Sequence, residues 1–269
     1  MNAKGMQLVA GPMRAILRSG LIWSASVAAV IFITVAVWPA FKGNAEISNS
    51  IVNSMPSGVI QAFGLENFGS PAGFLRANLY DFFIPLLMAG SAVGFANSLT
   101  ASEEDSGRLE LILAQPVTRH AVFLGRALAV FGWVAIVTVL ATLTQFAADL
   151  LFDLQIGADR LLATLLLSCL LALFCAGVTL GVAGIRGRGS VALGVGLLVA
   201  VGGCIVATLF PISSSLAELA HLSPWDWAFA GDPLSNSTAF WRYLALGLPA
   251  IGLTLLAIWA FARRDVSAA

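Results

Sequence analysis

The sequence predicts an all-α integral membrane protein with six membrane-spanning helices, and three observations favour this class. The 269 residues are 59% hydrophobic and only 10% charged, with a mean hydropathy of +0.91, whereas a soluble domain carries about 25% charged residues. Long apolar runs recur, and a hydrocarbon core of about 30 Å needs roughly 20 apolar residues in helix. The alternating stretches of about ten residues that build a membrane β-barrel do not occur.

Six apolar runs are long enough to span. A backbone in lipid must satisfy its own hydrogen bonds, so each run is predicted to be a helix. The runs cover about residues 20–41, 81–100, 122–147, 161–185, 191–211 and 241–262. We treat residues 1–269 as a single membrane domain.

Basic residues gather on one side of this predicted topology. The formal net charge is zero, which gives no reason to expect a nucleic-acid partner. The other side keeps only Lys42, Arg76, Arg160 and Arg242. Because basic residues concentrate on the cytoplasmic side, both termini are predicted to be cytoplasmic. The residues on that side are Lys4, Arg14, Arg18, Arg108, Arg119, Arg126, Arg186, Arg188, Arg263 and Arg264.

The segments outside the spans are short. Residues 6–19 predict an amphipathic helix along the inner membrane surface. The longest outer loop, 42–80, contains two candidate short helices at 59–63 and 72–80, and residues 186–190 predict a tight inner hairpin. Trp225 and Trp227 suit the headgroup level. The three cysteines lie inside apolar runs without a CxxC pair, which predicts buried reduced thiols and no metal site.

The charged stretch SEEDSGRLELILAQPV, residues 102–117, lies between the second and third runs. Ser102 and Asp105 resemble a capping box, so a short helix is predicted to begin at Ser102. It should end at Gln115, because Pro116 disfavours helical geometry in the residue before it. Thr118 is then placed to cap the third span.

The predicted short helix has two unlike faces. At about 100° per residue, Leu109, Ile112 and Leu113 share one side, while Glu104, Gly107, Arg108 and Gln115 lie on the other. Leu111 falls among the polar residues, which is typical of a docking surface, although an incidental exposed leucine fits the same pattern.

The stretch EEDSGRLELILAQPVTRHAVFLGRAL resembles the cytoplasmic segment after the second helix in permeases of the ABC type-2 transporter family. Arg108 stands where threonine is usual, and Arg126 stands near a usual lysine. The closing FARRD, the segment LSPWDWAFAGDPL and the outer SPAGFLRANLYDFFIPLL resemble the family too, and RSGLIWS is similar to the start of bacterial antibiotic and drug exporter permeases. The family pattern is filled by Glu103, Glu104, Gly107, Leu109, Glu110, Leu113, Pro116, Thr118 and Arg119.

The resemblance implies a permease half in the bacterial inner membrane. Its partners would be ABC ATPase subunits, membrane lipid and a second permease half, either a copy or a paralogue. A P-loop needs Gly-Lys-Ser/Thr, and both lysines, Lys4 and Lys42, are followed by glycine. We therefore expect no catalysis and no cofactor in this chain, with ATP and Mg²⁺ bound by the partner. The expected ATPase-coupling residues are Glu103, Glu104, Gly107, Arg108, Leu109, Glu110, Leu111, Leu113, Pro116 and Arg119.

The span interiors indicate the type of cargo. The predicted spans contain no ionisable residues suited to a proton relay. A path without such charges favours export of a hydrophobic or amphipathic compound. Six polar residues either line a path or form helix–helix hydrogen bonds. They are Asn97, Ser98, Thr142, Gln145, Thr164 and Ser168.

Two other functions are weighed against transport. Residues 103–108 also fit EExxxR, the glutamate motif of CAAX-type intramembrane proteases, but such enzymes need further histidines and only His120 and His221 occur. A regulatory membrane protein without transport of its own is the second alternative.

Overall fold

The computed structural model describes residues 3–42, 54–56, 59–60 and 65–264, and these contain helices and no strand. Among them, six helices are long and apolar enough to cross a membrane, which confirms the predicted fold class. The observed spans are Leu17–Phe41, Pro71–Asp105, Arg119–Phe152, Ala158–Arg186, Gly189–Ile212 and Phe240–Arg263.

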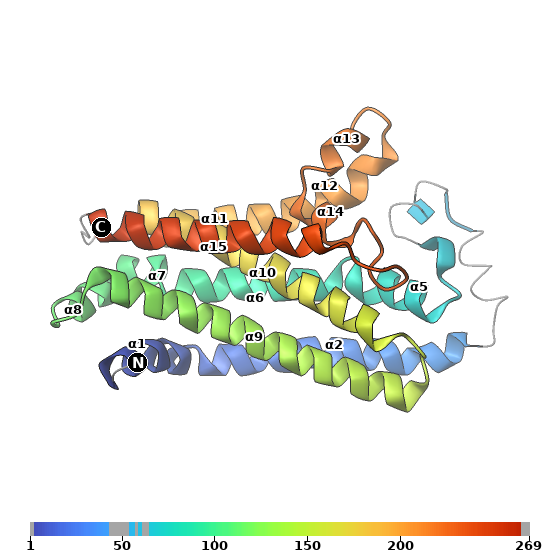
Figure 1. Ribbon diagram of the computed structural model, residues 1–269, viewed down its shortest axis with the longest axis horizontal. Coiled ribbons are helices and arrows are strands. Elements are labelled where there is room, and N and C mark those ends of the chain that lie inside the picture. The colour runs from blue at the N-terminus through green and yellow to red at the C-terminus, as the bar shows by residue number, and fades with distance from the viewer. Residues whose placement is uncertain (1–2, 43–53, 57–58, 61–64, 265–269) are drawn as a thin grey trace.

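The spans form an elongated bundle around α10 (Ala158–Arg186). This helix packs against α6 (Phe83–Ser98), α9 (Arg119–Phe152), α11 (Gly189–Leu197) and α15 (Phe240–Arg263). It is accordingly the most buried span, at 61% of its apolar window, whereas Gly189–Ile212 is the least, at 17%. The start of α1 (Ala3–Ala15) and the end of α15 lie at one end of the bundle, here called the terminus end, and the opposite end is the loop end (Figure 1).

The second span is longer than predicted because it includes the outer segment before it. Ser70 caps α5 (Pro71–Leu75) by accepting a 3.0 Å hydrogen bond from the Gly73 amide. The π-helix η2 (Arg76–Tyr80) then leads into α6. The helix expected at 72–80 therefore exists but continues into the membrane span. Preceding it is the 3-10 turn η1 (Leu65–Asn67), and most of the helix expected at 59–63 lies outside the described residues.

The predicted amphipathic start is the helix α1, and it packs against the bundle. The Trp133 indole donates a 3.1 Å hydrogen bond to the Met13 carbonyl. A Cβ added at Gly125 would lie 2.5 Å from the Leu8 carbonyl oxygen, so this glycine permits the close approach of α1 to α9. After α1, the chain continues directly into α2 (Leu17–Phe41).

The fifth span is irregular and carries a cap at the loop end. After the tight hairpin at Gly187, α11 is followed by the π-helix η3 (Leu198–Gly202), α12 (Gly203–Leu209) and η4 (Phe210–Ile212). The cap consists of α13 (Ala217–Ala220) and α14 (Pro224–Phe229). Trp225 of α14 is only 2% exposed and donates a 2.8 Å hydrogen bond to the Ala200 carbonyl. Trp225 is therefore buried within the chain, where its indole fastens the cap to the fifth span, and its position at the headgroup level stays a prediction.

Candidate functional site

The polar segment after α6 is two helices rather than one. α7 (Ala101–Asp105) and α8 (Arg108–Leu113) are separated by Gly107, whose φ of +71° is in the left-handed region that favours glycine. The Gly107 amide donates to the Glu104 carbonyl and ends α7. The predicted continuous helix 102–115 is therefore wrong. Ser102 is not a cap either, since α7 begins one residue before it. Thr118 caps α9 as predicted, accepting from the Ala121 amide at 3.3 Å.

The three acids of α7 point to three different elements of the bundle. Glu103 forms an ion pair with Arg126 of α9, whose side chain is 3% exposed. Asp105 accepts a 2.8 Å hydrogen bond from the Gly189 amide at the start of α11. The third acid, Glu104, is 7% exposed and pairs with Arg264, which follows α15. α7 thus links spans two, three, five and six at the terminus end, and we call these contacts the acidic hub.

The end of the sixth span is fixed in the hub by a second basic residue. Arg119 donates to the Arg264 carbonyl. Gly187 lies against the same guanidinium: its φ is +67°, and an added Cβ would fall 2.1 Å from Nη1 of Arg264. The positive φ favours glycine, and a side chain there would displace the guanidinium of Arg264, so the hairpin between spans four and five is shaped to the hub.

Helix α8 has one face in the bundle and one face open. Leu109 is 1% exposed, and Ile112 and Leu113 pack against the main core. Leu111 is 74% exposed, beside the exposed residues Arg108 and Glu110. The expected exposed leucine on a charged face is therefore present.

The structure divides the ten predicted coupling residues into two groups. Glu103, Glu104, Leu109 and Arg119 make contacts within the chain that hold the segment in place, together with the turn at Gly107. The open surface contains Arg108, Glu110, Leu111 and Pro116, with Leu113 partly buried beside them. A surface for another protein would be formed by this second group.

The six polar residues proposed for a path do not form one surface. Gln145, Thr164 and Ser168 are completely buried. The Gln145 amide oxygen accepts a 2.9 Å hydrogen bond from the Tyr80 hydroxyl, joining α9 to η2. The hydroxyls of Ser98, Thr142, Thr164 and Ser168 donate to carbonyls of their own helices, and the Asn97 Oδ1 is buried without a partner among the described residues. Their role in transport stays a prediction.

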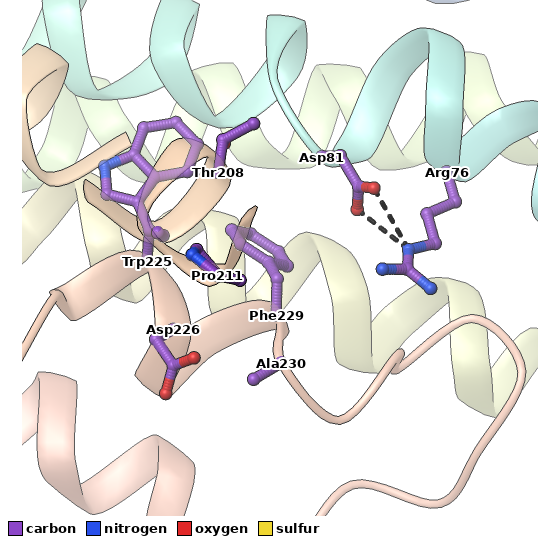
Figure 2. Close-up of a pocket in the computed structure, with 9 residues that line it drawn as sticks. Arg76, Asp81, Thr208, Pro211, Trp225, Asp226, Phe229 and Ala230 are labelled. Atoms are coloured by element: carbon purple, nitrogen blue, oxygen red, sulfur yellow. Dashed lines mark hydrogen bonds and ion pairs between the residues drawn. The ribbon is translucent and has the colours of Figure 1, made fainter. Parts of the chain in front are cut away.

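A cavity of about 320 Å³ lies at the loop end, between the second span and the cap (Figure 2). Arg76 donates through Nε to both oxygens of Asp81, at 3.1 and 3.0 Å, and its Nη1 lies 3.4 Å from Asp232. Trp225 and Phe229 line the cavity opposite this ion pair. The cavity has a charged side and an aromatic side.

The sequence analysis did not predict the ion pairs of the acidic hub. Arg126 was assigned to the basic side of the topology and to the family pattern, although a charge within an apolar helix normally requires a buried partner. That signal could have suggested an acid of the segment between spans two and three, which contains Glu103. No sequence signal joined Arg264 to Glu104, since the two are 160 positions apart.

Comparison with known proteins gives one family. Residues 6–266 match the model of the ABC-2 family transporter protein. No curated protein matches the chain.

Proposed function

Because the chain belongs to the ABC-2 transporter family, we propose that it is the permease half of an ATP-driven exporter and that α8 receives the force of a separate ATPase. The observation that carries this proposal is Leu111, which is 74% exposed on a helix whose opposite face is buried. An apolar side chain among charged residues suits a protein partner. α8 follows α7 directly, so movement of α8 would reach the acidic hub and four spans.

We propose that ATP and Mg²⁺ are bound by the partner. Two permease halves would enclose the path, and the fifth span is the best candidate for the face between them, since only 17% of its apolar window is buried within one chain. ATP binding would favour one arrangement of the halves by binding it more tightly, and hydrolysis would reset the arrangement.

A hydrophobic or amphipathic cargo, such as an antibiotic, fits the composition of the spans. Three of the described ionisable residues within or next to them, Arg126, Arg76 and Asp81, are paired with opposite charges. Their charge is therefore compensated inside the protein and does not call for a charged substrate. We also propose that both termini are cytoplasmic and that the chain resides in a bacterial inner membrane, which the distribution of basic residues and the family resemblance support.

The protease alternative is poorly supported by the geometry. Its glutamates, Glu103 and Glu104, form ion pairs with arginines. His120 lies at the start of α9 at the terminus end, whereas His221 lies between α13 and α14 at the loop end (Figure 1). A shared metal or water site would need these groups close together.

The test is co-purification with the ATPase from the native membrane. Leu111→Asp should abolish recovery of a P-loop ATPase and of ATP hydrolysis in the eluate. The matched control is Leu222→Asp, which changes a 71% exposed leucine at the loop end and should leave both unchanged. Equal ATPase recovery with both variants would refute the docking role of α8, and no ATPase even with the unaltered chain would favour the regulatory alternative.

A further inference from the structure

A second cavity, of about 250 Å³, lies at the terminus end between α1, α8 and α9. It is larger than the roughly 150 Å³ that holds a benzene molecule in a protein interior. Its wall is apolar on three sides, formed by Leu8 and Pro12 of α1, Ile112 of α8 and Val122 of α9. Gln7, Glu103 and Arg126 supply the polar part.

Arg126 has a hydrogen-bonding group that nothing described in the chain uses. The residue is 2% exposed, and its Nη2 donates to Glu103. Its Nη1 is buried and has no hydrogen-bond partner among the described residues. A guanidinium carries N–H groups on both nitrogens, and a buried donor without an acceptor is costly. Although Gln7 lines the same cavity, Nη1 of Arg126 makes no hydrogen bond to it, so an oxygen acceptor for this group would have to come from a bound molecule.

The position of Arg126 along α9 indicates the source of that oxygen. The helix has 34 residues, so at 1.5 Å per residue it is about 51 Å long, against a hydrocarbon core of about 30 Å. If the helix is centred in the bilayer, about 10 Å projects beyond the core at each end. Arg126 is seven residues from the start of α9, or about 10 Å. With α9 centred in this way, Arg126 is level with the boundary between acyl chains and headgroups.

We propose that this cavity binds one phospholipid of the leaflet at the terminus end. A phosphodiester oxygen accepts hydrogen bonds from Nη1 of Arg126, and the glycerol and upper acyl carbons pack on the apolar wall. Because Glu103 already neutralises Arg126, recognition depends on the phosphate oxygens more than on the charge of the outer headgroup. The bound lipid fills the space between α1 and α8, and so supports the position of the proposed docking helix.

Native mass spectrometry of the delipidated full chain in detergent, titrated with dimyristoyl phosphatidylglycerol, tests this proposal. We expect one tightly held lipid per chain. Gly11→Phe should weaken it roughly tenfold or more, because Gly11 lines the cavity and has open space around its Cβ position. Gly252→Phe is the matched control, since Gly252 is an exposed helical glycine of α15, also with open space, and it should bind as the unaltered chain does.

Two further arms identify the recognised group. Dimyristoylglycerol, which lacks the phosphate, should bind roughly tenfold more weakly or worse, and millimolar inorganic phosphate should not displace the phospholipid. If Gly11→Phe does not fold, Ala15→Phe at the end of the same helix blocks the cavity instead. The proposal would be overturned if the cavity variant and the control variant bound the phospholipid equally well. It would also be overturned if dimyristoylglycerol bound as tightly as the phospholipid, or if free phosphate displaced the phospholipid. None of these readouts requires an ATPase, so the result is independent of the proposed function.

Discussion

Removing the negative charge of Glu103 should destabilise the chain more than any exposed charge change. Glu103→Gln leaves the guanidinium of Arg126, 2% exposed, without its counter-ion. Breaking a buried ion pair from one side costs about 3–5 kcal/mol. At about 2 °C per kcal/mol for a chain of this size, the apparent unfolding temperature should fall by roughly 6–10 °C.

The chain contains its own reporter for this measurement. Cys169, Cys175 and Cys204 are free and buried, so a thiol-reactive fluorescent dye labels them only as the bundle opens. The matched control is Glu218→Gln, the same change at an exposed position of α13, and it should shift the unfolding temperature by less than about 1 °C.

A double variant shows whether the loss of stability in Glu103→Gln comes from the broken ion pair or from lost packing. Replacing a buried pair by apolar side chains is often nearly neutral, so Glu103→Gln combined with Arg126→Met should recover most of the loss seen with Glu103→Gln alone. If the two changes add, or if Glu103→Gln unfolds at the temperature of the Glu218→Gln control, the hub does not hold α7 as described.

Three other outcomes follow from local geometry. Gly107→Ala should lower the unfolding temperature by roughly 2–4 °C, because a left-handed alanine costs about 1–2 kcal/mol; no shift would exclude the left-handed turn. Trp225→Phe should cost about 1–3 kcal/mol by removing the donor to the Ala200 carbonyl, and unchanged stability would show that the cap is not fastened there. The hydrogen bond to Asp226 raises the pKa of His221 above 6.5, so its stabilisation is complete below that value and is lost as the pH rises through the raised pKa. The chain should therefore be slightly more stable at pH 6 than at pH 8 relative to His221→Gln, and parallel pH profiles of the two would contradict this.

The six spans could be predicted because hydropathy is a local property. A run of about 20 apolar residues has one stable form in lipid whatever it packs against. The exposure of Leu111 could be predicted for the same reason. Helical periodicity alone places Leu111 on a different face from Leu109 and Leu113.

The acidic hub could not be predicted, because its partners come together only in the folded bundle. The sequence places Glu103 and Glu104 in a polar segment between spans, which suggests solvent, yet they form ion pairs with Arg126 of α9 and with Arg264 at the end of α15, and Glu104 is buried. The break at Gly107 did have a signal, a glycine after a short helix. The predicted helix instead ended at Gln115, and Gly107 was placed on its polar face.

Trp225 makes a packing contact that its assignment to the membrane surface did not include. An indole in a loop between apolar runs usually suits the headgroup level. Here the irregular π-helix η3 presents the Ala200 carbonyl to Trp225, and the residue is buried. No pattern in the sequence predicted that π turn.

Photo-crosslinking in the native membrane tests the central claim most directly. A photoreactive amino acid replaces Leu111 in one version of the full chain and the similarly exposed Leu222 in another. We expect illumination to join a P-loop ATPase to position 111 and not to position 222. An ATPase crosslinked at neither position, or only at position 222, would contradict the assignment of α8 as the place where ATP hydrolysis acts on this permease.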